Sequence, residues 1–182
     1  MSSPSRRPAD RANRASHPVL SIREIALLSL LGALIFATKF ALASLPNINL
    51  NSLLIILTVV FFGWKAFYSV GVYIMLEGLI FGFSVWWISY IFVWPVLVFV
   101  AMLFRKNESP VLWAVIAGAY GLCFGPLMYI PYFFINGGWE MYFAMWVNGI
   151  PFDLVHCGGN FVLTLVLYRP LHVLLRRLIE KS

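Results

Sequence analysis

Five polar side chains lie within long apolar stretches, where a charged or hydrogen-bonding group usually has a function. Lys39 and Glu77 are in the first and third stretches. Asp153, His156 and Asn160 follow at spacings of three and four residues, which places them on one face of a helix. An unpaired charge in lipid costs roughly 3 kcal/mol or more, so such residues mark ion pairs, proton relays or ligand sites. Lys39 can pair with Glu77 or with Asp153, and both pairings stay open at this point.

Enzymatic chemistry at these residues would need partners that the sequence does not supply. Glu77, Asp153 and His156 could form a metal or acid–base site of an intramembrane enzyme. Catalytic zinc takes three protein ligands and a water, and the other histidines lie elsewhere, His17 in the polar N-terminal tract and His172 in the basic C-terminal segment. Nucleotide-binding and hydrolase motifs are also missing from the sequence. We therefore predict no metal site and no enzymatic activity.

Amide and aromatic residues gather near one set of ends of the apolar stretches. Asn47, Asn49 and Asn51 alternate along the first connection, and Trp87, Tyr90 and Trp94 share one helical face. Tryptophan and tyrosine also anchor helices at headgroup level, which accounts for part of this pattern. The amides favour a pocket for a flat ligand with polar edges. The candidate binding residues are Asn47, Asn49, Asn51, Trp87, Tyr90, Tyr132, Asn148, Asp153, His156 and Asn160.

The composition indicates that lipid surrounds most of these residues. The chain has 182 residues, of which 62% are hydrophobic and 11% charged, whereas soluble domains carry about 25% charged residues. All 13 basic residues except Lys39 lie in the termini or in alternate connections, which predicts that both termini are cytoplasmic. This pattern excludes a soluble enzyme and a nucleic-acid-binding protein. Cys123 and Cys157 lie in apolar surroundings, so we expect buried thiols or small packing residues rather than a disulfide.

The apolar stretches predict an all-α integral membrane protein with six transmembrane helices. We expect residues 1–20 to form a disordered basic cytoplasmic tail and residues 21–182 to form the six-helix transmembrane domain. Pro126 and Pro131 should kink the fifth helix, and residues 139–147 should lie at the membrane interface. The expected helices cover residues 24–45, 50–62, 66–83, 86–104, 111–135 and 150–168.

The first expected helix carries two local patterns. Ser21 and Glu24 have the spacing of a capping box at its N-terminus. Ala33, Ala37 and Ala41 recur every fourth residue, and small residues at this spacing let another helix approach closely in lipid. Such a surface serves either packing within the chain or the docking of a partner.

The six helices, the cytoplasmic termini, the alanine spacing and the amide-bearing first external loop together resemble the S component of energy-coupling factor (ECF) vitamin transporters. The resemblance covers residues 21–178 and implies the S-component bundle in the cell membrane. It implies that the chain captures a vitamin from outside and docks through Ala33, Ala37 and Ala41 on a transmembrane coupling protein. Two cytoplasmic ATPases drive that coupling protein, so ATP is hydrolysed by partners and this chain binds no cofactor.

Three stretches look most similar to S components that transport cobalamin: LPNINLNSLLIIL, LEGLIFGFSVWWISYIFVWP and GIPFDLVHCGGNF. Cobalamin is large, flat and rimmed with amides, which suits the aromatic and amide candidates. His156 then has two interpretations, a cobalt ligand or a helix-capping or ion-paired histidine beside Asp153, and we favour the second. Riboflavin, folate and pantothenate are the alternative substrates.

Two further hypotheses come from other classes of membrane protein. A stand-alone carrier would couple transport to an ion gradient through Lys39 and Glu77. Such carriers are commonly built from inverted repeats, and we find no internal repeat in the sequence. The other hypothesis is a structural membrane subunit without a ligand.

Overall fold

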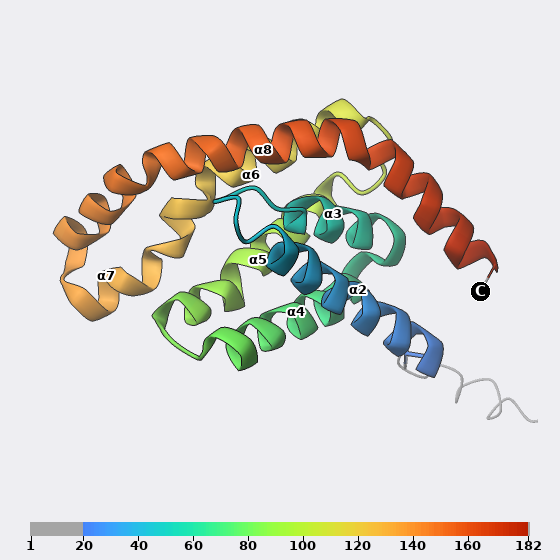
Figure 1. Ribbon diagram of the computed structural model, residues 1–182, viewed down its shortest axis with the longest axis horizontal. Helices are drawn as coiled ribbons and strands as arrows, with labels where there is room; N and C mark the ends of the chain where they lie inside the picture. The colour runs from blue at the N-terminus through green and yellow to red at the C-terminus, as the bar shows by residue number, and fades with distance from the viewer. Residues whose placement is uncertain (1–19, 182) are drawn as a thin grey trace, which may run out of the picture.

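The computed structural model describes residues 20–181, and every regular element in that range is a helix (Figure 1). Residues 1–19 of the expected tail lie outside this range. In chain order the elements are α2 (Ile22–Ala41), α3 (Asn51–Phe62), the 3-10 turn η1 (Gly63–Lys65), α4 (Ala66–Phe81), α5 (Val85–Leu103), α6 (Pro110–Met128), α7 (Ile130–Asn136) and α8 (Gly138–Lys181).

Helix α2 begins at the capping box that the sequence predicts. The Ser21 hydroxyl accepts a hydrogen bond from the backbone N–H of Glu24, and the Glu24 carboxylate accepts one from the backbone N–H of Ser21. Glu24 also forms an ion pair with Lys65, so the beginnings of α2 and α4 lie at the same end of the molecule. The helix ends at Ala41, earlier than expected, because residues 42–46 turn ahead of Pro46.

Helices α2 and α4 run side by side in the same direction. Near their beginnings the Ser69 hydroxyl donates a 2.7 Å hydrogen bond to the Leu28 carbonyl, and near their ends Lys39 pairs with Glu77. Gly32 permits this close approach, because a Cβ at that position would lie 2.5 Å from the Ser69 carbonyl oxygen. One small residue of α2 therefore packs within the chain.

Helix α3 is the interior helix of the bundle. Its residues from Asn51 to Val59 are all buried, and the Asn51 side chain donates a hydrogen bond to the Tyr73 hydroxyl on α4. The two helices are antiparallel because the chain reverses at Gly63, whose φ of 60° favours glycine. With 12 residues, α3 extends only about 18 Å, less than the ~30 Å of a hydrocarbon layer. The connection at residues 42–50 leads directly into this buried helix.

Helices α6 and α8 pack antiparallel against each other along a seam of glycines. A Cβ on Gly121 would lie 2.8 Å from the backbone carbonyl of His156, and a Cβ on Gly125 would lie 2.3 Å from the Asp153 carboxylate. Figure 1 shows α8 arching over α6 along its length. The glycines thus bring the face that carries Asp153 and His156 directly onto α6.

The structure corrects the expected last segment of the chain. One continuous helix, Gly138–Lys181, replaces the expected interfacial segment at 139–147 and the separate helix at 150–168. Pro151 and Pro170 lie inside it. Helices in lipid tolerate proline because neighbouring groups and local adjustments satisfy the freed backbone carbonyls. The expected helix already contained Pro151, so the wrong boundaries are the break before residue 150 and the end before Pro170.

The expected kink at Pro131 is a break between two helices. Helix α6 ends at Met128, and α7 begins at Ile130 with Pro131 in its first turn. Proline is favoured in a first turn, where its missing N–H has no partner to lose. Pro126 lies inside α6.

Five helical stretches among residues 20–181 are long and apolar enough to cross a membrane. They are α2, the run from α3 through α4, α5, α6 with α7, and α8. Lys65 and Arg105 lie at one end of the bundle, where Arg105 donates to the Val60 carbonyl at 3.2 Å. We call this the basic end, and we call the opposite end, which holds residues 42–50, the loop end.

The two cysteines are free, and one of them is more exposed than expected. Cys157 is half-buried on α8, whereas Cys123 is exposed on α6. The expectation of two buried thiols is therefore wrong for Cys123. An apolar neighbourhood in a membrane helix includes the lipid-facing surface, so apolar sequence context does not imply burial in protein.

Candidate functional site

A cavity of about 460 Å³ lies at the loop end of the bundle. Residues from the connection after α2 and the first residue of α3 line one side, and side chains from α2, α4, α5, α6 and α8 line the rest. Small-molecule sites typically have volumes of ~300–1,000 Å³. Most of the wall is apolar or aromatic, with a few polar groups, which is the usual character of such a site.

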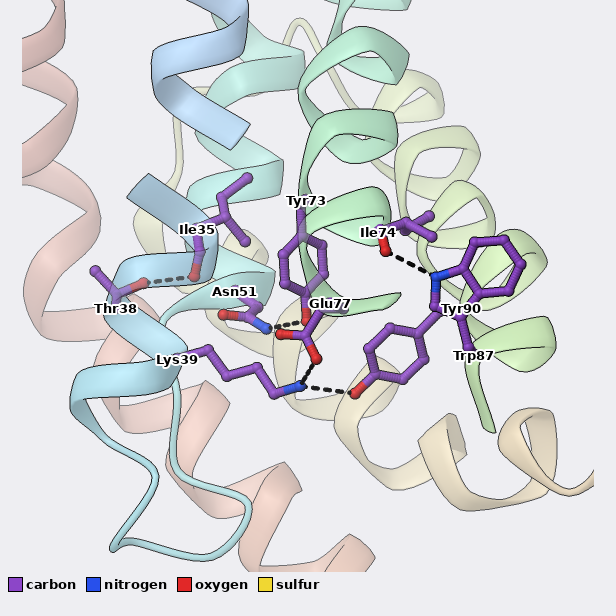
Figure 2. A network of polar contacts seen from close by, with 9 residues as sticks. All are labelled: Ile35, Thr38, Lys39, Asn51, Tyr73, Ile74, Glu77, Trp87 and Tyr90. Carbon is purple, nitrogen blue, oxygen red and sulfur yellow. Dashed lines mark hydrogen bonds and ion pairs between the residues drawn. The ribbon is translucent and has the colours of Figure 1, made fainter. Parts of the chain in front are cut away.

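An ion pair lies on the wall of the cavity between α2 and α4. The Lys39 ammonium is 2.5 Å from Oε2 of Glu77 and donates a second hydrogen bond, 3.1 Å long, to the Tyr90 hydroxyl (Figure 2). Its nitrogen also lies 5.0 Å from the centre of the Tyr90 ring and 5.8 Å from that of Phe81. Of the two pairings open from the sequence, the structure contains the one with Glu77.

Amide groups from the connection after α2 lie next to this ion pair. The Asn51 amide donates a 2.8 Å hydrogen bond to the Tyr73 hydroxyl, one helical turn before Glu77 (Figure 2). The Asn49 side chain accepts a 3.1 Å bond from the backbone N–H of Asn51, two residues later, and so forms a local turn just before α3. Asn47 has a φ of 56°, a backbone conformation that asparagine adopts more readily than most residues. These bonds fix the loop over the cavity.

Four aromatic rings, joined by successive contacts, form another part of the wall. The Trp94 ring centre is 5.6 Å from that of Tyr90 and 5.3 Å from that of Phe124. The Phe124 ring in turn lies 4.8 Å from the His156 imidazole, nearly perpendicular to it. Each contact has the separation of a favourable aromatic pair. The wall is therefore a connected set of rings that begins at the ion pair and ends at a histidine.

Several buried polar atoms on residues of the cavity wall have no hydrogen-bond partner in the described part of the chain. They are Oδ1 of Asn51, Oε1 of Glu77, Nε1 of Trp94 and both ring nitrogens of His156. These residues are 0%, 1%, 1% and 2% exposed, respectively. Buried polar groups are nearly always paired, and leaving one unpaired costs about 1–3 kcal/mol. Oδ2 of Asp153 and Oγ1 of Thr164, on residues that do not line the cavity, are unpaired as well, but most of the unpaired atoms belong to residues of the cavity wall.

The cavity brings together about half of the candidate binding residues. Asn47, Asn49, Asn51, Tyr90 and His156 line it. The two residues expected to form an intramembrane ion pair line it as well.

Three other candidates have partners elsewhere in the fold. Trp87 donates its indole N–H to the Ile74 carbonyl at 2.8 Å, on the far side of Tyr90 from Lys39 (Figure 2). Asn160 donates to the Ser52 hydroxyl and the Ala117 carbonyl, and Asp153 accepts from the backbone N–H of Gly125. Trp87 and Asp153 therefore each join two helices and Asn160 joins three, a role that sequence spacing alone does not distinguish from ligand binding.

The last two candidates do not line the cavity, and one expected pairing is wrong. Tyr132 packs against Tyr129, with ring centres 6.4 Å apart, and Asn148 is exposed on α8. His156 was expected to cap a helix or pair with Asp153, but both of its nitrogens lack a partner in the described residues. The α6 glycine seam gives the Asp153 carboxylate a backbone donor at Gly125 instead.

The sequence also left part of the wall unidentified. Trp86, Trp94, Phe124 and Met128 line the cavity but were not among the candidates. Trp94 lies on the same helical face as Tyr90, four residues later, so that pattern contained the signal for it. For Phe124 and Met128 on α6 no sequence signal was available, because only the packing of α6 against α5 and α8 turns them toward the cavity.

The three alanines expected to dock a partner lie on the outward face of α2. Ala37 and Ala41 are exposed and Ala33 is half-buried. Leu30 and Leu34 on the same side are 67% and 43% exposed. Apart from the half-buried Ala33, this face is therefore not used for packing among residues 20–181.

No family model matches the chain, and comparison with curated proteins and with solved structures also gives no match. Within residues 20–181 no three His, Cys, Asp or Glu side chains lie together as in a metal site.

Proposed function

We propose that this protein is a membrane-embedded solute-binding subunit of the S-component type, which binds a vitamin-sized molecule in the cavity at the loop end. The observation that carries this proposal is the set of unpaired polar atoms on Asn51, Glu77, Trp94 and His156 around that cavity. A purely structural subunit would have no reason to keep four costly unpaired groups around one space.

The proposed orientation places the cavity on the outside of the cell membrane. Lys65 and Arg105 belong to the basic end, and the connection that lines the cavity carries no lysine or arginine. By the positive-inside rule the basic end is cytoplasmic. In this arrangement the chain crosses the membrane six times, with both termini inside, and α3 with its preceding connection forms one crossing.

The volume of the cavity favours the smaller substrates among those that the resemblance implies. About 460 Å³ suits a drug-sized molecule, whereas the corrin ring of cobalamin with its side chains is much larger. Riboflavin, folate or pantothenate therefore fits this cavity better than cobalamin does. Cobalamin would need the connection at residues 42–50 to move outward.

Transport would depend on partners. The outward face of α2 with Ala33, Ala37 and Ala41 is the proposed docking surface for a transmembrane coupling protein. Two cytoplasmic ATPases would supply the energy.

Calorimetric titration of the purified full chain tests the proposal. The panel contains riboflavin, folate, pantothenate and cobalamin, with the variant Tyr90→Ala as a cavity control. We expect one vitamin to bind saturably and the variant to bind it at least tenfold more weakly. If no vitamin binds, or if the variant binds equally well, the proposed function is wrong.

The ion pair between Lys39 and Glu77 favours a second candidate function, a carrier driven by an ion gradient. Lys39 and Glu77 on the cavity wall are groups that could couple solute movement to a cation. Vesicles reconstituted with this chain alone distinguish the two. Uphill accumulation of solute on applying a cation gradient would favour the carrier, and its absence together with vitamin binding would favour the S-component type.

A further inference from the structure

We propose that the cavity selects a solute that carries a carboxylate group on an apolar or aromatic body, and that the carboxylate binds the Lys39 ammonium. This inference rests on the proposed function, because it names the substrate class of the same site. It depends on which charged and polar groups of the cavity wall a solute can reach, and on what each of them can still bond.

The charge that a solute can reach in the cavity is positive. Among the described residues that line it, Lys39 and Glu77 carry a charge. The Lys39 side chain is 29% exposed, whereas that of Glu77 is 1% exposed. Oε1 of Glu77 has no hydrogen bond in the described residues, but it is itself buried. A solute therefore meets the ammonium and not the carboxylate of this pair.

The Lys39 ammonium keeps one N–H for a solute. An ammonium group has three donors. One bonds Oε2 of Glu77 and a second bonds the Tyr90 hydroxyl at 3.1 Å, and these are its two hydrogen bonds in the part of the chain that the structure describes (Figure 2). A carboxylate that accepts the third N–H would form a charge-assisted hydrogen bond, about twice as strong as a neutral one.

Asn49, in the connection over the cavity, also offers donors. Its side-chain oxygen accepts from the backbone N–H of Asn51, while the two N–H donors of its amide have no partner among the described residues. Asn49 is half-buried and lines the cavity, so a solute can reach it. Like Lys39, it therefore favours a solute that supplies acceptors.

Glu77 limits the solute to a single negative charge at the lysine. It already compensates Lys39, so a doubly charged group such as a phosphate would add excess negative charge beside a buried carboxylate. A cationic solute would be repelled by the ammonium that it meets first. The body of the solute follows from the rest of the wall, which is mostly aliphatic and aromatic and includes the rings of Tyr90, Trp94 and Phe124.

The vitamin panel tests the inference, because pantothenate and folate carry carboxylates whereas riboflavin and cobalamin do not. We expect pantothenate or folate to bind the full chain saturably in calorimetric titration. The matched uncharged probes are panthenol, in which an alcohol replaces the carboxylate of pantothenate, and the dimethyl ester of folate. The probe that corresponds to the bound vitamin should bind about tenfold more weakly or worse, because it forms no ion pair with Lys39. Equal binding of vitamin and probe, or no binding of pantothenate and folate, would overturn the inference.

A double variant tests whether Lys39 recognises the carboxylate. Lys39→Met combined with Glu77→Gln removes both charges, so that neither is left buried without its partner. The bound vitamin should lose about tenfold or more in affinity, whereas the affinity of its uncharged probe should change by less than about threefold. A merely structural role of the ion pair would weaken both equally, and that result would overturn the assignment of Lys39.

The other ion pair of α2 provides the matched control. Lys65→Met combined with Glu24→Gln removes a lysine–glutamate pair at the basic end, away from the cavity, and should leave both affinities unchanged. Thermal unfolding of the two double variants checks that they fold. If the cavity variant does not fold, the comparison of vitamin with probe on the unmodified chain still decides the inference.

The outcomes separate this inference from the proposed function. Binding of riboflavin or cobalamin without binding of pantothenate or folate would leave the solute-binding function standing and reject the carboxylate. Failure of all four vitamins to bind would reject the two together.

Discussion

Lys39 and Glu77 illustrate how a charged pair is held inside an apolar bundle. Glu77 is 1% exposed, whereas 29% of the Lys39 side chain is exposed toward the loop end. The lysine keeps a hydrogen bond to Tyr90 and two ring contacts in addition to the carboxylate. The two charges therefore compensate each other at the cavity wall, and Oε1 of Glu77 remains without a hydrogen bond in the described residues.

Replacing Glu77 with glutamine should destabilise the protein by about 1–3 kcal/mol. Breaking a fully buried ion pair on one side costs roughly 3–5 kcal/mol, and the exposure of Lys39 with its remaining Tyr90 contact reduces that cost. Thermal unfolding in detergent measures the effect. Glu140→Gln is the matched control, because Glu140 is exposed on α8. Equal unfolding midpoints for the two variants would contradict this role of the ion pair.

The sequence predicted which polar residues need a partner, but it only partly predicted which partner each of them has. An intramembrane charge must be paired, so a partner for Lys39 was expected before the fold was known. Asn160 and Asp153 share a helical face with His156, yet only His156 lines the cavity. The difference depends on which neighbouring helix each contacts, and a spacing along one helix contains no information about that.

At the scale of helices, the seam between α6 and α8 decides how the last helix is placed. Without side chains at Gly121 and Gly125, the backbone of α6 lies directly against α8. In lipid, where apolar surface gains little from association, such close packing is a main source of helix–helix affinity. The seam thereby holds the His156 backbone beside α6 and sets the depth of the imidazole in the cavity wall.

Gly121→Ala should therefore destabilise the protein, by about 1–3 kcal/mol. The new methyl group would meet the His156 carbonyl at 2.8 Å, and a backbone atom on a packed helix cannot move aside as a side chain would. Gly158→Ala provides the control on the facing helix, since nothing lies within 4 Å of a Cβ there. That variant should be neutral or more stable by up to about 1 kcal/mol. Unfolding midpoints in detergent compare them, and an undisturbed Gly121→Ala would argue against a tight seam.

The apolar runs of the sequence predicted where helices lie, whereas proline and glycine did not always predict where those helices end. The capping box at Ser21 and the start of α3 at Asn51 are where the sequence predicts them. The end expected before Pro170 and the break expected before residue 150 are both absent, because α8 continues through them. The rules for helix termini derive from solvated backbone, and helices in lipid tolerate proline better than helices in water do.

For the whole molecule, the positive-inside pattern predicts which end faces the cytoplasm. Ser84 is exposed in the connection after α4 at the loop end, and Lys106 is exposed at the basic end. In a chain without Cys123 and Cys157, a membrane-impermeant maleimide should label Ser84→Cys in intact cells. Lys106→Cys should react only after permeabilisation. The reverse pattern would invert the orientation and place the cavity inside.

The outward face of α2 predicts a separation of binding from transport. Ala37→Trp adds a bulky side chain to an exposed position, which should block close approach of a partner helix. Uptake by cells should be abolished, while calorimetry on the isolated variant should give an affinity within a few-fold of the parent chain. Val162→Trp, on an exposed position of α8, should leave uptake intact. Normal uptake by Ala37→Trp would move the docking surface to another helix.

The unbroken course of α8 has a mechanical consequence. It carries His156 at the cavity wall and Arg176 at the opposite end, with no loop between them. Twenty residues of helix amount to about 30 Å, the thickness of the hydrocarbon layer. If the proposed solute binds against the imidazole, a small tilt of α8 there would become a larger displacement at Arg176, provided that the helix stays straight through Pro170. Occupancy of the proposed site would then change the position of the opposite end of the bundle.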